Sequence, residues 1–242
     1  MVRPGRPPQD PARQLERAHR ILDAAAELVL RWGYDKTTID DVSKRAGVAK
    51  GTIYLHWKTR DDLFAALLRR ERVRMLADVR GRGPTTLSEL YGEFARALLG
   101  RPLLSAFMRG DSELLGKFAR QKQQAGRPPE MGGPLDAYVA ELVKRGAVRE
   151  EVGDHILVAN AVLYGFLFVP DRRPDEPRPS DDRIADMIAD TIERTMSTGR
   201  PLSGDDASAV ARATLDFLDA TEEVAQRKLA ASMGGSKGSR SV

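Results

Sequence analysis

A glycine turn between two short polar segments is the feature that most restricts how this chain can fold. Thr38 precedes the segment 39–46, IDDVSKRA, and Asp41 lies three residues after Thr38. This pattern is typical of a capped helix start with acidic residues in its first turn. Gly47 comes next and supplies a tight or left-handed turn, which glycine adopts at the lowest cost. A further short helix is predicted to begin at Ala49 or Lys50.

A longer amphipathic helix precedes this pair. Its apolar residues recur at the spacing of one helical face, and Gly33 ends the pattern. The stripe comprises Ile21, Ala24, Ala25, Leu28, Val29 and Trp32. A long helix followed by two short helices around a glycine turn predicts a helix-turn-helix domain.

The last helix of such a domain enters the major groove of DNA with its N-terminal residues nearest the base edges. Lys50 and Thr52 occupy that end, and Gly51 has no side chain to keep the helix backbone away from the duplex. Ile53 and Trp57 are separated by one helical turn and are predicted to be buried. The residues predicted to turn outward, toward the DNA strands, are Tyr54, Leu55 and His56.

Positive charge is concentrated in the first quarter of the chain. Residues 1–60 hold twelve Lys and Arg against seven Asp and Glu, whereas the remainder holds 27 basic and 28 acidic residues. A basic module joined to a neutral domain is expected for a protein that binds a polyanion, although a solvated charged surface explains the asymmetry as well. Lys58 and Arg60 follow the third helix and are predicted to be phosphate partners.

The composition also bears on the cellular context. The chain has no cysteine, which excludes disulfides, thiol catalysis and thiolate metal sites. Its N-terminal segment, MVRPGRPPQDPARQ, carries prolines where an export signal would be apolar. We therefore expect a cytoplasmic protein.

The run from Thr37 to Leu68, TTIDDVSKRAGVAKGTIYLHWKTRDDLFAALL, resembles the DNA-binding domain of the TetR family of bacterial transcriptional regulators. The likeness covers about residues 14–74 and includes the helix caps, the Gly-Val turn and both aromatics of the third helix. It departs at Ala49, where many members have Ser or Thr, so that a side-chain N-cap worth about 1 kcal/mol is lost.

This resemblance implies roles for individual residues. The implied phosphate contacts are Thr38, Thr52, Tyr54, His56, Lys58 and Arg60, and the implied base contacts are Lys50, Gly51 and Leu55. Simpler interpretations stay open: Tyr54 as a half-buried core aromatic, His56 as an ordinary surface histidine, and the two cations after the helix as solvated charges.

The expected domain organisation has four parts. These are a flexible basic arm over residues 1–13, a helix-turn-helix domain over 14–62, a helical regulatory and dimerisation domain over 63–232, and a disordered tail over 233–242. Within the arm, Arg3 to Pro8 resembles segments that insert into A·T-rich minor grooves, but Pro4 stands where an arginine would flank the glycine. A disordered tail is the alternative interpretation.

The remainder shows no strand pattern and no internal repeat, so we predict an all-α chain. A fourth helix, expected from about Arg60 to Val79, connects the two domains. Further helices are predicted at Leu87–Leu99, Leu103–Gln123, Leu135–Lys144, Asp154–Val169, Asp182–Met196 and Ala207–Ala231. The proline-rich segment from Pro170 to Asp182 is long for a connection within a compact helical domain.

The segment from His155 to Val169 is apolar on nearly every side but too short for a membrane span, which needs about 20 apolar residues. Such a helix is buried inside its own domain or against another chain. TetR-like proteins pair core helices across a dimer, so the resemblance implies a homodimer. The expected interface residues are Leu163, Leu167, Ile184, Ile188 and Ile192. Core packing without dimerisation is the alternative.

The resemblance also implies a ligand cavity among the middle helices. Its expected lining is Phe94, Phe107, Met108, Phe118 and Tyr138. Met and Phe suit a small apolar or aromatic ligand, and simple core packing is the alternative for the same residues.

Catalysis is not expected. Glu151 and His155 share a helical face, but the C-terminal domain has a single histidine, too few for a ferritin-like di-iron site, and we find no Ser-His-acid grouping. We therefore predict a regulator without enzyme activity, metal or cofactor, which binds a palindromic double-stranded DNA operator and is released from it by a small molecule. A regulator without an inducer, and an enzyme fused to a DNA-binding domain, are the alternatives.

Overall fold

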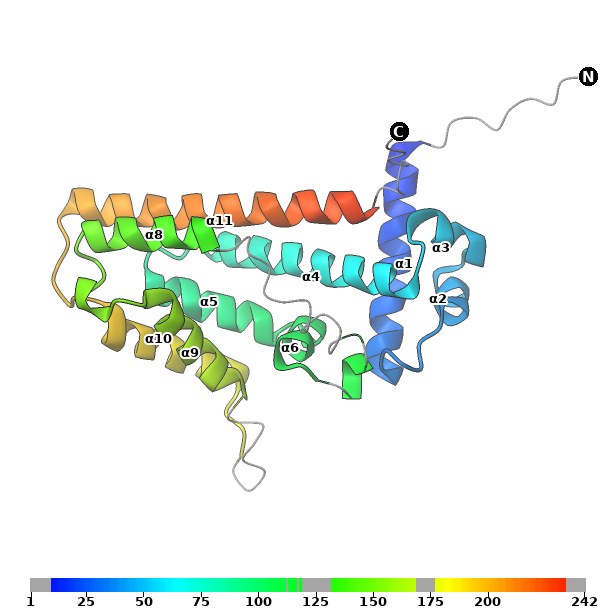
Figure 1. Cartoon of the computed structure of the whole chain (residues 1–242), viewed down its shortest axis with the longest axis horizontal. Coiled ribbons are helices and arrows are strands. Elements are labelled where there is room, and N and C mark those ends of the chain that lie inside the picture. Colours follow the sequence, from blue (N-terminus) through cyan, green and yellow to red (C-terminus); the bar gives the residue numbers. More distant parts are fainter. Residues whose placement is uncertain (1–9, 112, 117, 119–131, 169–176, 234–242) are drawn as a thin grey trace, which may run out of the picture.

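A computed structural model describes residues 10–111, 113–116, 118, 132–168 and 177–233. Across these ranges the chain is helical, and its only β-type pairing is an isolated antiparallel bridge between Val148 and Ser197. The predicted all-α class is confirmed. Figure 1 shows an elongated molecule with a small helical head at one end of a longer helical body.

The head consists of α1 (Pro11–Trp32), α2 (Ile39–Ala46) and α3 (Lys50–His56). Asp10 caps α1 by accepting a hydrogen bond from the amide of Ala12 at 3.0 Å. Because α1 already begins at Pro11, the arm predicted over residues 1–13 is too long, and the Arg3–Pro8 motif lies outside the described residues. The predicted apolar stripe of α1 is buried except for Trp32, whose ring is 41% exposed.

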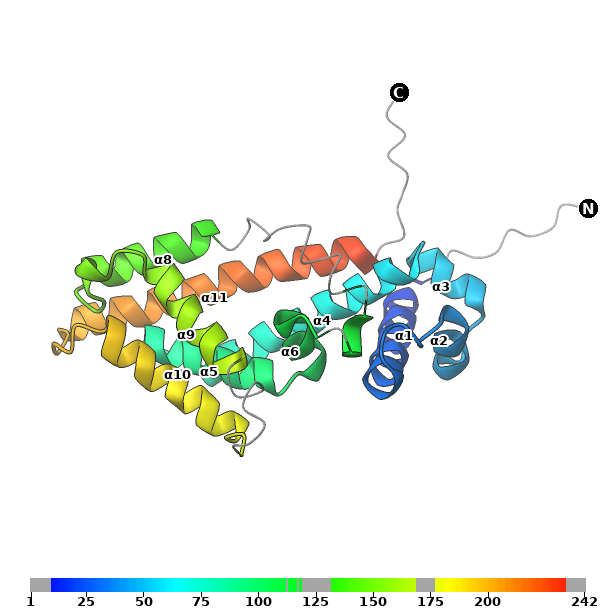
Figure 2. The ribbon, with the colours of Figure 1, turned by 60° about the horizontal axis from the view of Figure 1, so that its bottom comes forward.

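Two long helices connect the head to the body. α4 (Arg60–Arg82) and α11 (Gly204–Met233) run side by side along the length of the molecule, as Figure 1 and Figure 2 both show. The body is completed by α5 (Leu87–Leu99), α6 (Pro102–Arg109), α8 (Gly132–Lys144), a short 3-10 helix (Glu150–Val152), α9 (His155–Phe168) and α10 (Asp181–Met196).

The predicted helices are found with small shifts at their ends, with one exception. The single helix expected from Leu103 to Gln123 is wrong, because α6 ends at Arg109. Gly110 follows with φ +67°, a left-handed conformation that closes the helix through its amide. The described part of the chain contains no helix long and apolar enough to cross a membrane.

The apolar side chains form two cores. The core of the head includes Leu63, Phe64 and Leu67 from the first turns of α4, together with Leu103 and Phe118 from the body. The predicted boundary after residue 62 is therefore misplaced, because it divides this core. Leu68, one residue further on, packs against both cores and joins them.

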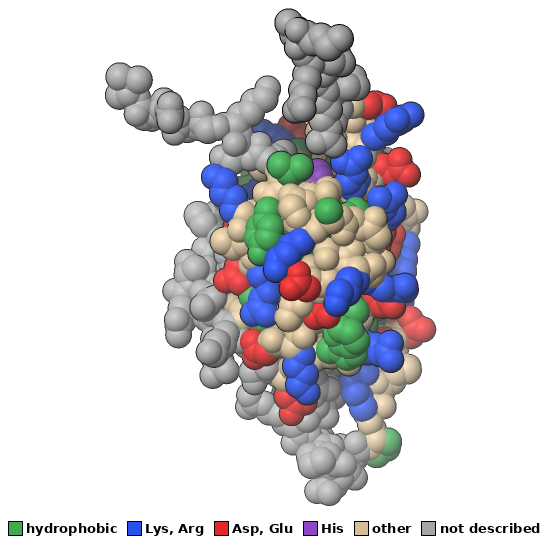
Figure 3. All heavy atoms as spheres, turned by 90° about the vertical axis from the view of Figure 1, so that its right-hand side faces the viewer, with side chains coloured by type: hydrophobic (Ala, Val, Ile, Leu, Met, Phe, Trp, Pro, Cys, Tyr) green, Lys and Arg blue, Asp and Glu red, His purple; other side chains and the backbone are tan. Residues whose placement is uncertain are grey.

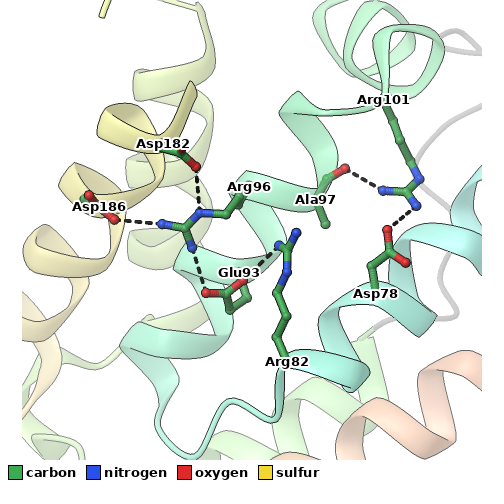
Figure 4. Close-up of polar contacts among 8 residues, drawn as sticks. All are labelled: Asp78, Arg82, Glu93, Arg96, Ala97, Arg101, Asp182 and Asp186. Atoms are coloured by element: carbon green, nitrogen blue, oxygen red, sulfur yellow. Dashed lines mark hydrogen bonds and ion pairs between the residues drawn. The ribbon is translucent and has the colours of Figure 1, made fainter. Parts of the chain in front are cut away.

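Charged side chains tie the helices of the body together on its outer side (Figure 4). Arg96 of α5 donates hydrogen bonds to Asp182 at 3.0 Å and Asp186 at 2.8 Å, both on α10. Its third bond goes to Glu93, which also accepts from Arg82 of α4 at 2.9 Å. These ion pairs link α4, α5 and α10 at the surface, and because their side chains are partly or largely exposed they add little net stability.

The side chains assigned to a dimer interface lie instead inside the single chain. Leu163, Leu167, Ile184, Ile188 and Ile192 are all buried in the core of the body. α10 turns its apolar stripe toward α5, against which it packs along its length. Within the single chain these five side chains are therefore core residues, and their assignment to a dimer interface is not supported by their burial.

Candidate DNA-binding surface

The start of α2 is fixed by a reciprocal cap. Thr38 accepts a hydrogen bond from the amide of Asp41 at 3.2 Å, and the Asp41 carboxylate accepts one from the amide of Thr38 at 3.1 Å. Hydrogen bonds from Thr38 hold the pKa of Asp41 below its usual value. The predicted cap is confirmed, and an equivalent pair, Thr59 and Asp62, begins α4.

The turn between α2 and α3 has the predicted geometry. Gly47 lies in the left-handed region with φ +63°, and the next amide, that of Val48, donates to the carbonyl of Ser43 at 3.0 Å. Ala49 begins α3 without a side-chain hydrogen bond, as its residue type predicts. The turn from α2 into α3 is therefore closed by backbone hydrogen bonds, without a side-chain cap.

α3 has one buried side and one exposed side. Ile53 and Trp57 are 0% and 2% exposed, which confirms their predicted burial. Tyr54 and Leu55, by contrast, are 45% and 66% exposed. These two side chains are therefore available on the surface of the head for contact with a partner.

Gly51 lies on the exposed side of α3, and nothing inside the protein requires a glycine there. A Cβ atom at this position would meet no other atom within 4 Å, and the backbone is not in the left-handed region. Glycine in a helix costs up to about 1 kcal/mol relative to alanine. At Gly51 the helix backbone is therefore open to the outside of the molecule.

Lys50 forms an ion pair with Asp40 of α2, with 2.9 Å between its Nζ and the carboxylate. This hydrogen bond raises the pKa of Lys50, so the side chain is charged near neutral pH. Both side chains are about half exposed, and such a pair contributes little net free energy. Lys50 can therefore leave Asp40 for a phosphate or a base at low cost.

Arg60 lies apart from the other predicted contacts. Its guanidinium donates to the carbonyls of Thr37 at 3.2 Å and Tyr34 at 3.4 Å and lies 4.1 Å from the centre of the Tyr34 ring. The Tyr34 hydroxyl donates to Asp61, and burial raises the pKa of Tyr34 to about 12. Arg60 thus joins α4 to the loop between α1 and α2. Local sequence patterns do not predict this contact, because its partners are distant in sequence.

The remaining predicted residues lie on α3 and on the segments before α2 and after α3. Thr38 and Lys58 are exposed, whereas Thr52 and His56 are half-buried. Burial lowers the pKa of the His56 ring, which is consequently neutral near pH 7. Figure 3, which faces the head, shows Lys and Arg side chains distributed among Asp, Glu and exposed hydrophobic groups. The surface is therefore mixed in charge.

The residues predicted to line a ligand cavity are divided between the two cores. Phe94, Met108 and Tyr138 pack in the core of the body, whereas Phe107 and Phe118 pack in that of the head. Tyr138 also stacks on Phe217, with 5.1 Å between ring centres, and its hydroxyl lies 3.0 Å from that of Thr214. These contacts are those of structural core residues.

A cleft of about 190 Å³ lies elsewhere, at the end of the body far from the head. It is bounded by the start of α5, the ends of α8 and α10, and the loop before α11. Leu142, Val148 and Leu202 contribute apolar lining, and Ser88 and Glu193 contribute polar groups joined by a 2.8 Å hydrogen bond. Local patterns give no sign of this cleft, because its walls come from distant parts of the chain.

A three-helix head with an exposed helix after a glycine turn, carried on a larger helical body, defines a helix-turn-helix DNA-binding regulator. Comparisons agree with this class. Residues 21–67 match the family model of bacterial regulatory proteins of the tetR family. The HTH-type transcriptional repressor Rv1474c of Mycobacterium tuberculosis is 38% identical over 185 residues, which cover 74% of this chain and 94% of that protein. The chain belongs to the TetR family of bacterial transcriptional regulators.

Other similarities are narrower. The fatty acid metabolism regulator protein of Bacillus subtilis is 40% identical over 50 residues, which cover 21% of this chain and 26% of that protein. A crystal structure of a TetR-family regulator from Mesorhizobium loti superposes with a TM-score of 0.54 at 18% identity, covering 77% of this chain and 99% of that one. This structural likeness concerns the fold alone.

Proposed function

We propose that this regulator binds a palindromic operator as a homodimer and represses transcription. The observation that carries the proposal is the exposed side of α3, where Gly51 leaves the backbone open between Lys50 and the exposed Tyr54 and Leu55. Repression is supported by the name of the Mycobacterium tuberculosis relative, a transcriptional repressor. A two-fold dimer would present two copies of α3 about 34–36 Å apart, one turn of DNA, or a multiple of it.

The proposed contacts keep most of the predicted set. Lys50, Gly51 and Leu55 face the bases, and Thr38, Thr52, Tyr54, His56 and Lys58 face phosphates. Arg60 is proposed instead to hold the loop before α2 in place, since its Nη1 already donates to the carbonyls of Tyr34 and Thr37. An arginine used in this way affects DNA binding through the position of α2.

The outer side of α9 is the proposed dimer surface. Leu157 is 63% exposed, and the exposed Ala161 and half-buried Tyr164 continue its stripe at helical spacing. The inner side of the same helix is occupied by Ala159, Leu163 and Leu167. An apolar stripe of this kind on the surface of a soluble domain favours pairing with a second copy.

Release by a small molecule is the finer part of the proposal. The cleft between α5, α8 and α10 supports it, because apolar walls with a few polar groups are typical of ligand sites. Its volume is below the range of about 300–1,000 Å³ for drug-sized ligands. We therefore propose a small effector with both apolar and hydrogen-bonding groups.

DNA binding is tested by selecting duplexes from a random-sequence library with the full chain. We expect one palindromic sequence to be enriched. Lys58→Ala should weaken binding to every duplex about equally and lower the slope of affinity against salt by roughly one. Lys50→Ala should instead reduce discrimination between the selected and a scrambled duplex. Selection of no sequence, or unchanged affinities in both variants, would contradict the proposed surface.

A further inference from the structure

The end of α11 reaches the head and packs beneath α3. Met233, the last residue of α11, is 8% exposed and belongs to the core of the head, and Leu229 packs against the same core. The rest of α11 belongs to the body, where Val210 and Phe217 are buried in the other core. One helix thus contributes to both cores, although its last turn lies far along the chain from α3.

A specific hydrogen bond fixes this contact. The indole Nε1–H of Trp57 donates to the carbonyl oxygen of Ser232 at 2.8 Å. The last carbonyls of a helix have no partner within it, and a buried indole N–H requires an acceptor. Each group therefore satisfies the other, so the pairing has a defined geometry that apolar packing alone would not impose.

Trp57 is the residue that ends α3. Its backbone amide closes the helix by donating to the carbonyl of Ile53 at 2.9 Å, while its ring is held by α11. The neighbouring His56 ring, which packs on Trp57, also meets the backbone of Met233. The C-terminal end of α3 is accordingly clamped between the head and the end of α11.

α11 is also joined to α4 along its length. The two helices pack side by side, and Arg80 of α4 forms an ion pair with Asp219 of α11. At its other end, α11 begins beside the cleft, which Val210 helps to line. A displacement of the body relative to α4 would therefore reach Trp57 through α11.

We propose that the last turn of α11, Leu229–Met233, positions α3 for sequence-specific DNA binding, so that operator affinity depends on α11 as well as on α4. The proposal rests on the DNA-binding function proposed above. It assigns to Trp57, Leu229 and Met233 a positioning role: they set the tilt of α3 and touch no DNA. A displaced α3 loses base contacts first, because these depend on geometry more than phosphate contacts do.

The test uses the full chain and the duplex selected by the parent protein. The variants are Leu229→Ala with Met233→Ala, which removes the packing, and Trp57→Phe, which keeps an aromatic ring but removes the donor. Leu215→Ala is the matched control, since it changes the same residue type on the same helix where the side chain is 39% exposed and belongs to neither core. Dissociation constants are measured for the selected duplex and for a scrambled one, with thermal unfolding recorded in parallel.

We expect the double variant to bind the selected duplex at least about tenfold more weakly and Trp57→Phe about two- to tenfold more weakly. Binding to the scrambled duplex should stay within about twofold, and the control should match the parent on both. Equal losses on both duplexes, or losses that track unfolding of the head, would reduce the contact to a stabilising one and overturn the proposal. Unchanged affinity for the selected duplex would do the same. If the parent itself selects no duplex, the DNA-binding function has failed first.

Discussion

At the position of Gly51, helix stability favours a larger residue, whereas the proposed DNA binding favours glycine. A side chain there would meet open space within the protein, and helix propensity favours alanine over glycine. A methyl group would, however, stand between the backbone of α3 and an approaching duplex. The same substitution should therefore improve one property and damage the other.

We expect Gly51→Ala to raise the free energy of unfolding by up to about 1 kcal/mol and to weaken binding to the selected duplex by at least about tenfold, the cost of one good base contact. Thermal unfolding and a DNA titration on the same preparation measure both. Gly81, near the end of α4 and equally open, provides the control: Gly81→Ala should leave DNA affinity unchanged. A Gly51→Ala protein that binds the duplex as well as the parent does would remove the main argument for this surface.

α9 carries apolar residues on nearly every side, and the residues that the structure describes bury only its inner side. Its inner side packs in the core through Leu163 and Leu167, and α10 sends Ile188 into the same core. Its outer side carries Leu157 with no cover from the described part of the chain. Substitutions on the two sides should therefore have different consequences.

A charge on the outer side should separate the subunits without unfolding them. We expect Leu157→Glu with Ala161→Glu to convert a dimer to a monomer in light scattering, with the thermal unfolding of the monomer largely retained. Ile188→Asp should instead destabilise the subunit itself by about 3–5 kcal/mol, because it buries an unpaired charge. A parent protein that is already monomeric, or an undisturbed dimer in the outer-side variant, would rule out this interface.

At the scale of the whole molecule, the head contacts α4 through buried side chains and also contacts two other parts of the body. Arg70 of α4, only 2% exposed, binds the carboxylate of Asp23 at 2.7 Å and the carbonyl of His19 at 3.0 Å, both on α1. The amide of Tyr34 donates to the carbonyl of Leu114 at 2.7 Å, and α11 reaches Trp57. Changes in the body can therefore reach the head through several rigid contacts.

An effector that binds the cleft must act by favouring one arrangement of head and body over another. Reciprocity requires that operator DNA weaken effector binding by the factor by which the effector weakens operator binding, typically about 5–150-fold. A thermal-shift screen of small metabolites, followed by titration of the hits with and without the selected duplex, measures both factors. Leu202→Trp, which fills the cleft, should abolish the thermal shift and leave DNA binding intact. A hit that binds this variant equally well would place the effector site elsewhere.

The sequence by itself determined the features that depend on near neighbours along the chain. The cap at Thr38, the turn at Gly47 and the buried pair Ile53 and Trp57 all follow from residues within a few positions of one another, so periodicity and side-chain chemistry sufficed to predict them. The fold class followed from the same local signals repeated over many helices.

Only the tertiary structure decided which apolar surfaces meet. The sequence pattern around Ile188 is the same whether this side chain packs against α5 or against a second subunit. Hydrophobic periodicity identifies the buried side of a helix but not the element that covers it. The phenylalanines and the tyrosine assigned to a ligand cavity proved to fill two cores for the same reason. Three features bring together residues that are distant in sequence: the contact of Arg60 with Tyr34, the cleft at the far end of the body, and the contact of Trp57 with the end of α11. Such features depend on how whole helices pack, and the local sequence carries no signal for that packing.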